Sequence, residues 1–102
     1  MDEEIKDSRK ELEREYNEKL EEITFRQRTV DQTADSMAEE GVYWLKKINP
    51  EASSREIYQI VDDYRNQARE AIGQERRKIT NQYEENRDEL NRKLRDQDGD
   101  IR

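Results

Sequence analysis

The feature that most constrains this chain is a pair of apolar stripes separated by the dipeptide Asn49-Pro50. In both arms, apolar or small residues recur at steps of 3, 4 or 7, which is the spacing of one face of an α-helix. The first stripe is Ile5, Leu12, Tyr16, Leu20, Ile23, Val30, Ala34, Met37, Gly41, Leu45 and Ile48, and the second is Ile57, Val61, Tyr64, Ala68, Ile72, Ile79, Tyr83, Leu90 and Leu94. Because proline disfavours the helical conformation in the residue before it, the first helix is predicted to stop beside Pro50.

These stripes predict an all-α fold in which two long antiparallel helices form a coiled-coil-like helical hairpin. We expect one domain over residues 1–102, with a helix over about 3–48, a turn over 49–53, a helix over about 54–96 and a polar tail over 97–102. Ser53 and Glu56 fit a capping box, in which the serine hydroxyl meets the amide of Glu56 and the glutamate reaches back.

The register of the hairpin can be predicted by folding the chain back at the turn. Facing residues then have numbers that add up to about 102, which places Leu45 opposite Ile57 and Met37 opposite Tyr64. The same register puts an acidic row across from two arginines; the row is Asp31, Asp35 and Glu39, and the arginines are Arg65 and Arg69. One continuous rod that dimerises through both stripes is the alternative, and Pro50 argues against it.

The composition indicates that the chain works with a protein partner. Only 29% of its residues are hydrophobic and 46% are charged, so a hairpin of this size has little apolar surface to bury by itself. The net charge of −7 argues against nucleic acid, which requires a concentrated basic face. The longest apolar run, Val42 to Leu45, is too short for membrane insertion or for a secretory signal.

No residue pattern in the chain indicates an enzyme. The sequence has no histidine and no cysteine, which removes the commonest general base, the thiolate nucleophile and the usual zinc ligands. It has three glycines and no glycine-rich loop that could hold a phosphate. We therefore predict no catalytic, cofactor-binding or metal-binding residues.

Apolar and aromatic side chains gather around the turn, and they cannot all point into one helix–helix seam. We predict that six of them bind a partner: Val42, Tyr43, Trp44, Ile48, Tyr58 and Ile60. The alternative is that these side chains close the end of the hairpin. Trp44, the only tryptophan, is the expected anchor of a partner helix, because tryptophan is enriched at binding hot spots.

A cysteine-free helical hairpin of about this length with a tryptophan near its turn resembles the small proteins of type VII secretion. These are the W-x-G family and the helical companions of LXG toxins. Trp44 is followed by Leu45-Lys46 and the nearest glycine, Gly41, precedes it, so the Trp-x-Gly turn is missing and the resemblance is to the LXG companions. The family's export motif, Tyr-x-x-x-Asp/Glu, is matched by Tyr58-Gln-Ile-Val-Asp62, although about one such match is expected by chance.

The resemblance implies a non-enzymatic adaptor, or targeting chaperone, that binds the N-terminal helical domain of an exported LXG-type toxin and promotes its type VII secretion. It implies a Gram-positive bacterium and a cytoplasmic protein, with co-export by a pathway that lacks a cleaved signal left open. The alternatives are a self-associating structural coiled coil of a phage or cytoskeletal type, and, more weakly, an antitoxin-like inhibitor.

Overall fold

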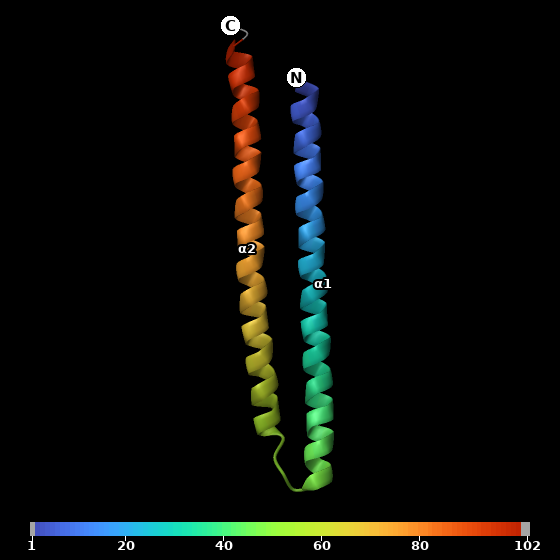
Figure 1. Cartoon of the computed structure of the whole chain (residues 1–102). Helices are drawn as coiled ribbons and strands as arrows, with labels where there is room; N and C mark the ends of the chain where they lie inside the picture. The colour runs from blue at the N-terminus through green and yellow to red at the C-terminus, as the bar shows by residue number, and fades with distance from the viewer. Residues whose placement is uncertain (1, 101–102) are drawn as a thin grey trace. The chain divides into compact units, whose positions relative to one another are not determined.

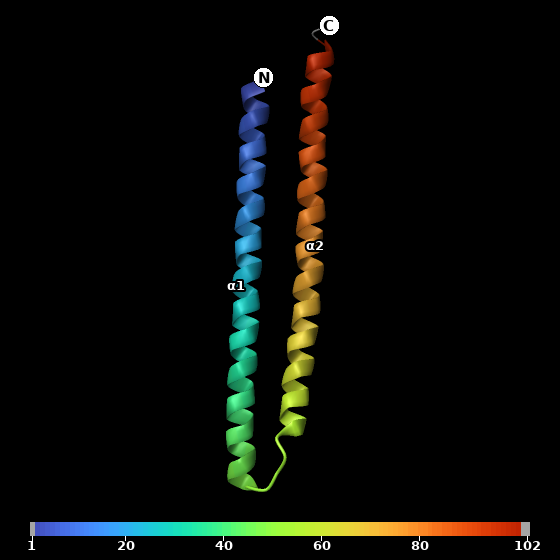
Figure 2. The same cartoon turned by 180° about the vertical axis from the view of Figure 1, so that it is seen from behind.

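The computed structural model describes the backbone of residues 2–100 and the side chains of residues 3–96. It contains two helices, α1 over Asp2–Ile48 and α2 over Arg55–Asp100. The two helices run antiparallel and pack against each other, which confirms the predicted all-α helical hairpin (Figure 1, and from behind in Figure 2).

The ends of α1 lie close to the predicted ones, but α2 is longer than expected. It begins at Arg55 and continues to Asp100, so residues 97–100 of the predicted polar tail are helical. This segment contains no proline, and continued helix gives its backbone amides their hydrogen-bond partners. The remaining two residues of the predicted tail, 101 and 102, lie outside the described residues.

The connection between the helices is built from asparagine, proline and serine. Asn49 donates its amide to the Leu45 carbonyl at 2.8 Å, and its own carbonyl then accepts from Ala52 at 3.0 Å. Pro50 therefore occupies the second position of a tight turn, where its fixed φ is favourable. The Asn49 side chain also accepts from the amide of Glu51 at 3.2 Å. No non-glycine residue in the described chain has a positive φ, so the turn forms without backbone strain.

The entry into α2 differs from the predicted capping box. Ser53 accepts a hydrogen bond from the amide of Arg55 at 3.3 Å, and not from Glu56. The first helical bond runs from the Tyr58 amide to the Ser54 carbonyl at 3.1 Å, so Ser54 takes the N-cap position. The helix thus starts one residue later than expected. Glu56 still lies in its first turn, where an acidic side chain complements the helix dipole.

The contacts of the hairpin divide into two compact units, each containing a segment of both helices. We call residues 23–74 the turn unit, and residues 1–22 with 75–102 the terminal unit. In the turn unit the core consists of Ile23, Ala34, Val61 and Ile72, which are buried. In the terminal unit Ile5 is buried, while most of the remaining stripe residues, such as Leu12 and Leu90, are only half-buried.

The register within each unit is shifted from the predicted one. A side chain added at Gly41 would meet Ile57 at 3.0 Å, and the rings of Tyr16 and Tyr83 stack with centroids 4.2 Å apart. These pairs have numbers that add up to 98 and 99, not 102. The cause is visible in Figure 1, where the segment 49–54 runs back beside the last part of α1 before α2 begins. The predicted pairing of Leu45 with Ile57 is therefore wrong.

Candidate functional site

An arginine occupies one position of the helix–helix seam in the turn unit. Its presence there affects which apolar side chains lie outside the seam. Val61, Arg65, Ala68 and Ile72 follow each other at steps of 4, 3 and 4, and all are buried or half-buried. Tyr64, which we predicted in the seam, is 36% exposed because Arg65 takes its place. The hydrocarbon stem of arginine can cover apolar surface while its charged end reaches a carboxylate.

Arg65 and Arg69 form ion pairs from α2 to α1 across one side of the seam. Arg65 Nη2 donates to Asp35 at 2.9 Å, and Arg69 Nη2 donates to Asp31 at 3.3 Å. Arg65 Nε lies 3.8 Å from the same Asp31 carboxylate and is buried without a hydrogen bond. The predicted charge pairing is confirmed for these two aspartates, whereas Glu39 forms no ion pair with any residue whose side chain the structure describes. We call this side of the turn unit, defined by Asp31, Asp35, Arg65 and Arg69, the ion-pair face.

The opposite side of the turn unit is apolar. Trp44 lies nine residues after Asp35, and Ile60 lies nine residues before Arg69. At about 100° per residue, nine residues make two and a half helical turns. The two members of each pair therefore point to opposite sides of their helix. Because the ion pairs join the two helices, the side of α1 that carries the aspartates and the side of α2 that carries the arginines belong to one face of the turn unit. The opposite sides of the two helices form the other face. Trp44 and Ile60 therefore share one face.

Three more exposed side chains join Trp44 and Ile60 on this face. Met37 precedes Trp44 by seven residues, Ile48 follows it by four, and Tyr64 follows Ile60 by four, which keeps each of them on the same side of its helix. We call these five residues the tryptophan face. Their exposed fractions are 39% for Met37, 57% for Trp44, 83% for Ile48, 62% for Ile60 and 36% for Tyr64.

The contact of Gly41 with Ile57 makes this face continuous across the seam. Moving one turn from Gly41 to Met37, and one turn from Ile57 to Val61, keeps the two helices level because their rise per residue is equal. Met37 is thus level with Val61, between Ile60 and Tyr64 on the neighbouring helix. The five side chains together expose on the order of 500 Å², the size of the largest patch on a typical monomer.

The six residues that we predicted as partner-binding do not form one surface. Trp44, Ile48 and Ile60 lie on the tryptophan face. Val42 is seven residues after Asp35, and Tyr58 is seven before Arg65, so both belong to the ion-pair side, and Val42 is half-buried. Tyr43 is 58% exposed and, lying two residues before the seam residue Leu45, points away from α2.

Lys47 links Tyr43 to the edge of the tryptophan face. Its ammonium lies 5.2 Å from the centre of the Tyr43 ring and 5.3 Å from that of Trp44. It also donates to the Tyr43 hydroxyl at 3.2 Å, and the two rings meet edge to face at 5.4 Å. These contacts restrict the indole on an exposed surface, which lowers the entropy that a partner must overcome to bind it.

Two features of the turn unit differ from those predicted from the sequence. Met37 and Tyr64 were predicted in the seam but are exposed on the tryptophan face. For Tyr64 the sequence contained a sign of this, because Arg65 also fits the helical spacing of the seam residues. Phe25 is 69% exposed, the highest value for an aromatic side chain in the described chain. Since it lies two residues after the buried Ile23, the helical period alone could have placed it on the outer side of α1.

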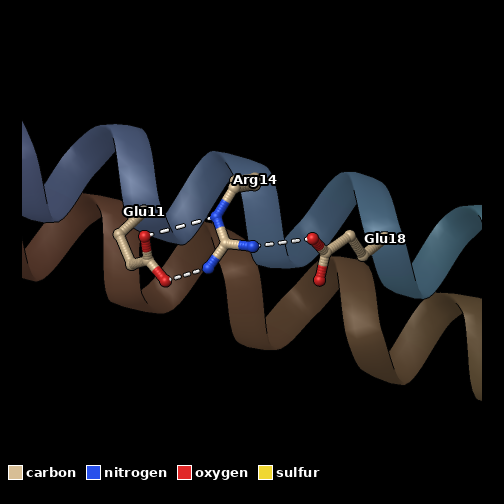
Figure 3. A network of polar contacts seen from close by, with 3 residues as sticks. All are labelled: Glu11, Arg14 and Glu18. Atoms are coloured by element: carbon tan, nitrogen blue, oxygen red, sulfur yellow. Dashed lines mark hydrogen bonds and ion pairs between the residues drawn. The ribbon is translucent and has the colours of Figure 1, made fainter.

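The terminal unit has a different surface. Its shallow groove is floored by Leu12 and Leu90 and bordered by charged or polar side chains, among them Asp7, Glu11, Glu15, Glu89 and Lys93. Arg14 donates to both Glu11 and Glu18 on the same helix, the latter at 2.7 Å (Figure 3). Chiefly through its hydrogen bond, Arg14 lowers the pKa of Glu11.

Among the described residues, no group of three or more histidine, cysteine, aspartate or glutamate side chains is arranged to hold a metal ion. No helix in the same part of the chain has the length and apolar character that crossing a membrane requires. Comparisons of the chain with protein-family models, with curated proteins and with solved structures find no match.

Proposed function

We propose that this chain is a non-enzymatic helical adaptor that binds a helical domain of a larger protein through its tryptophan face. The observation that carries the proposal is the concentration of exposed apolar side chains on one face of the turn unit. Five of its eight exposed large apolar side chains lie on the face opposite the ion pairs, and a two-helix layer has no third element to cover them. Helix-on-helix burial on this face would complete a bundle of three or four helices.

The resemblance to the companions of LXG toxins supplies the partner class. The client is the N-terminal helical domain of an LXG-type toxin, and the adaptor promotes its delivery to a type VII secretion machine. Such an adaptor acts in the cytoplasm, where toxin and companion meet before export. Trp44, Ile60 and Ile48 are the anchors in this proposal, joined by Met37 and Tyr64.

Co-purification with the helical domain of an LXG toxin from the same genome tests this function. Trp44→Ala should weaken the complex about thirtyfold, the effect of removing a side chain worth about 2 kcal/mol at a hot spot. Phe25→Ala is the matched control, because it removes an even more exposed aromatic ring from the outer side of α1 in the same unit. Equal binding of the parent and of the folded Trp44→Ala variant would refute the proposed site.

Self-association through the same face is the competing function, that of a structural coiled-coil assembly protein. Sedimentation of the purified chain at micromolar concentration distinguishes the two. A stable oligomer that Trp44→Ala dissociates, together with no complex with any toxin domain, would favour the structural role.

A further inference from the structure

The tryptophan face continues along α2 as an uncharged stripe at coiled-coil spacing. From Ile57 the residues at alternating steps of 3 and 4 are Ile57, Ile60, Tyr64, Gln67, Ala71 and Gln74. Ile57 is half-buried beside Gly41 at the edge of the seam, and the other five residues are exposed, so the stripe from Ile60 onward is distinct from the seam that faces α1. An uncharged stripe with this spacing is what a second coiled-coil helix packs against. It ends at Lys78, the next position of the series.

An acidic row borders this stripe on the side away from α1. Glu56, Asp63 and Glu70 follow each other at intervals of seven residues, each directly before a residue of the stripe. In coiled-coil terms they occupy the flanking position that forms ion pairs with a neighbouring helix. All three are exposed, and none forms an ion pair within the described chain, unlike Asp31 and Asp35 on the opposite face. Their charges are thus available to a partner.

The corresponding flank of α1 has no acidic row like that of α2, although Glu40 and Lys47 lie beside Trp44 on the same side of the helix. Thr29, Ser36 and Tyr43 border the α1 side of the tryptophan face at the same interval of seven. A second copy of the chain would therefore bring either the α1 flank, with Lys47 as its single cation beside Trp44, or another acidic row against Glu56, Asp63 and Glu70. Neither arrangement neutralises the three carboxylates, and two acidic rows would repel each other. Charge complementarity requires an occupant that is basic where this chain is acidic.

We infer that the tryptophan face takes one α-helix of a different protein, with an apolar stripe toward Trp44 and Ile60 and a row of lysine or arginine residues along Glu56, Asp63 and Glu70. The stripe from Ile57 to Gln74 is about 26 Å long at 1.5 Å per residue, which corresponds to roughly five turns of the partner helix. The inference rests on the proposed adaptor function and specifies the chemistry of the segment that is bound.

Two synthetic helical peptides of about 20 residues test this inference. Both carry leucine and isoleucine at the coiled-coil core positions; one has lysine at its flanking positions and the other has glutamate. Titrated against the full chain at low salt, the lysine peptide should bind about tenfold more tightly, because each of three exposed ion pairs contributes roughly a factor of two. The triple variant Glu56→Lys, Asp63→Lys, Glu70→Lys should reverse this preference.

A charge-matched variant in the terminal unit controls for the overall charge of the protein. Glu13→Lys, Glu15→Lys and Glu21→Lys change the net charge by the same amount on exposed residues that form no ion pair in the described chain. This variant should keep the preference for the lysine peptide. If the preference is reversed in this control, the net charge of the protein determines which peptide binds more tightly, and the inference is overturned.

The remaining outcomes separate the inference from the proposed function. If both peptides bind equally and both are lost in Trp44→Ala, the acidic row has no role; the inference is then overturned while the adaptor function stands. If neither peptide binds, and sedimentation shows a dimer that Trp44→Ala dissociates, the occupant is a second copy and both proposals are overturned.

Discussion

The turn unit and the terminal unit are built from the same two helices but differ in what they leave exposed. All eight large apolar side chains that are exposed in the described chain belong to residues 23–74: Phe25, Met37, Tyr43, Trp44, Ile48, Tyr58, Ile60 and Tyr64. In the terminal unit the described apolar side chains are at least half-buried, between charged neighbours. The large apolar side chains that the described chain leaves exposed therefore all lie on the turn unit.

The ion pairs of the two units also differ, although the terminal unit has a cross-helix hydrogen bond between Tyr16 and Thr80 at 3.0 Å. In the turn unit Arg65 and Arg69 reach from α2 to Asp31 and Asp35 on α1, so their ion pairs join the two helices. In the terminal unit Arg14 and Lys93 pair with glutamates of their own helix. A cross-helix ion pair restricts the helix pairing, whereas a pair within one helix supports only that helix.

The largest expected effect concerns the core. Ile23 is fully buried in the turn unit, so Ile23→Ala should lower the free energy of unfolding by about 2–4 kcal/mol. Leu12→Ala, at a half-buried position of the terminal unit, should cost about 1–2 kcal/mol, because less apolar surface is withdrawn from water there. Urea unfolding followed by circular dichroism measures both. Equal losses would remove the energetic difference between the units.

A second prediction concerns the close approach at Gly41. Alanine favours the helix over glycine by about 1 kcal/mol, but a methyl group here would lie 3.0 Å from Ile57 Cγ2, which is held by its branched carbon. Gly41→Ala should therefore destabilise the hairpin by about 1 kcal/mol. In an Ile57→Ala background the same change should stabilise it by about 1 kcal/mol. A double-mutant cycle by thermal or urea unfolding shows whether the sign reverses, and no reversal would contradict the register.

The cross-helix ion pairs give a third, smaller effect. Asp31→Asn combined with Asp35→Asn leaves the partly buried Arg65 without a carboxylate and should cost about 1 kcal/mol at low salt, less as salt is added. Glu89→Gln, which removes an exposed pair with Lys93 inside one helix, should cost about 0.3 kcal/mol. Chemical unfolding at two salt concentrations compares them. A loss in the double variant that does not depend on salt would mean that the aspartates act by packing alone.

The smallest effect is a titration in the terminal unit. The hydrogen bond from Arg14 lowers the pKa of Glu11; partial desolvation opposes this, and the charge of Arg14 adds to it. A carboxylate whose pKa is lowered on folding stabilises the native state above its unfolded pKa, and this contribution disappears as the pH falls through the folded pKa. In Arg14→Gln the pKa of Glu11 should return toward its ordinary value, as NMR titration of the side-chain carboxyl carbon can show. An unchanged pKa would mean that the contact is absent in solution.

Much of the fold could be predicted from the sequence because helical periodicity and Pro50 act locally. The end of α1 at Ile48 and the hairpin itself follow from them. The register could not be predicted, since it depends on the course of the segment 49–54 after Pro50. Hydrogen bonds of Asn49 and Ser53 set that course, and the pair of Gly41 and Ile57 is shifted by about one helical turn from the predicted register.

The candidate site could be predicted only in part, because apolar spacing alone does not show that a charged residue can occupy a seam position in place of an apolar one. Arg65 enters the seam by pairing with two aspartates, and Tyr64 is consequently displaced to the outside. As a result, Val42 and Tyr58 lie on the side of the ion pairs, whereas Trp44 and Ile60 lie on the tryptophan face. It could be found only once the ion pairs had shown which sides of α1 and α2 coincide.

The fluorescence of Trp44 tests the central claim most directly, because this is the only tryptophan in the chain. With 57% of its surface exposed, the indole should be readily quenched by acrylamide in the free protein at low concentration. Adding the partner helix should shift its emission to shorter wavelength and protect it from quenching. If the indole is already protected in the monomeric protein, or stays equally accessible in the complex, then the tryptophan face is not the surface that binds the partner.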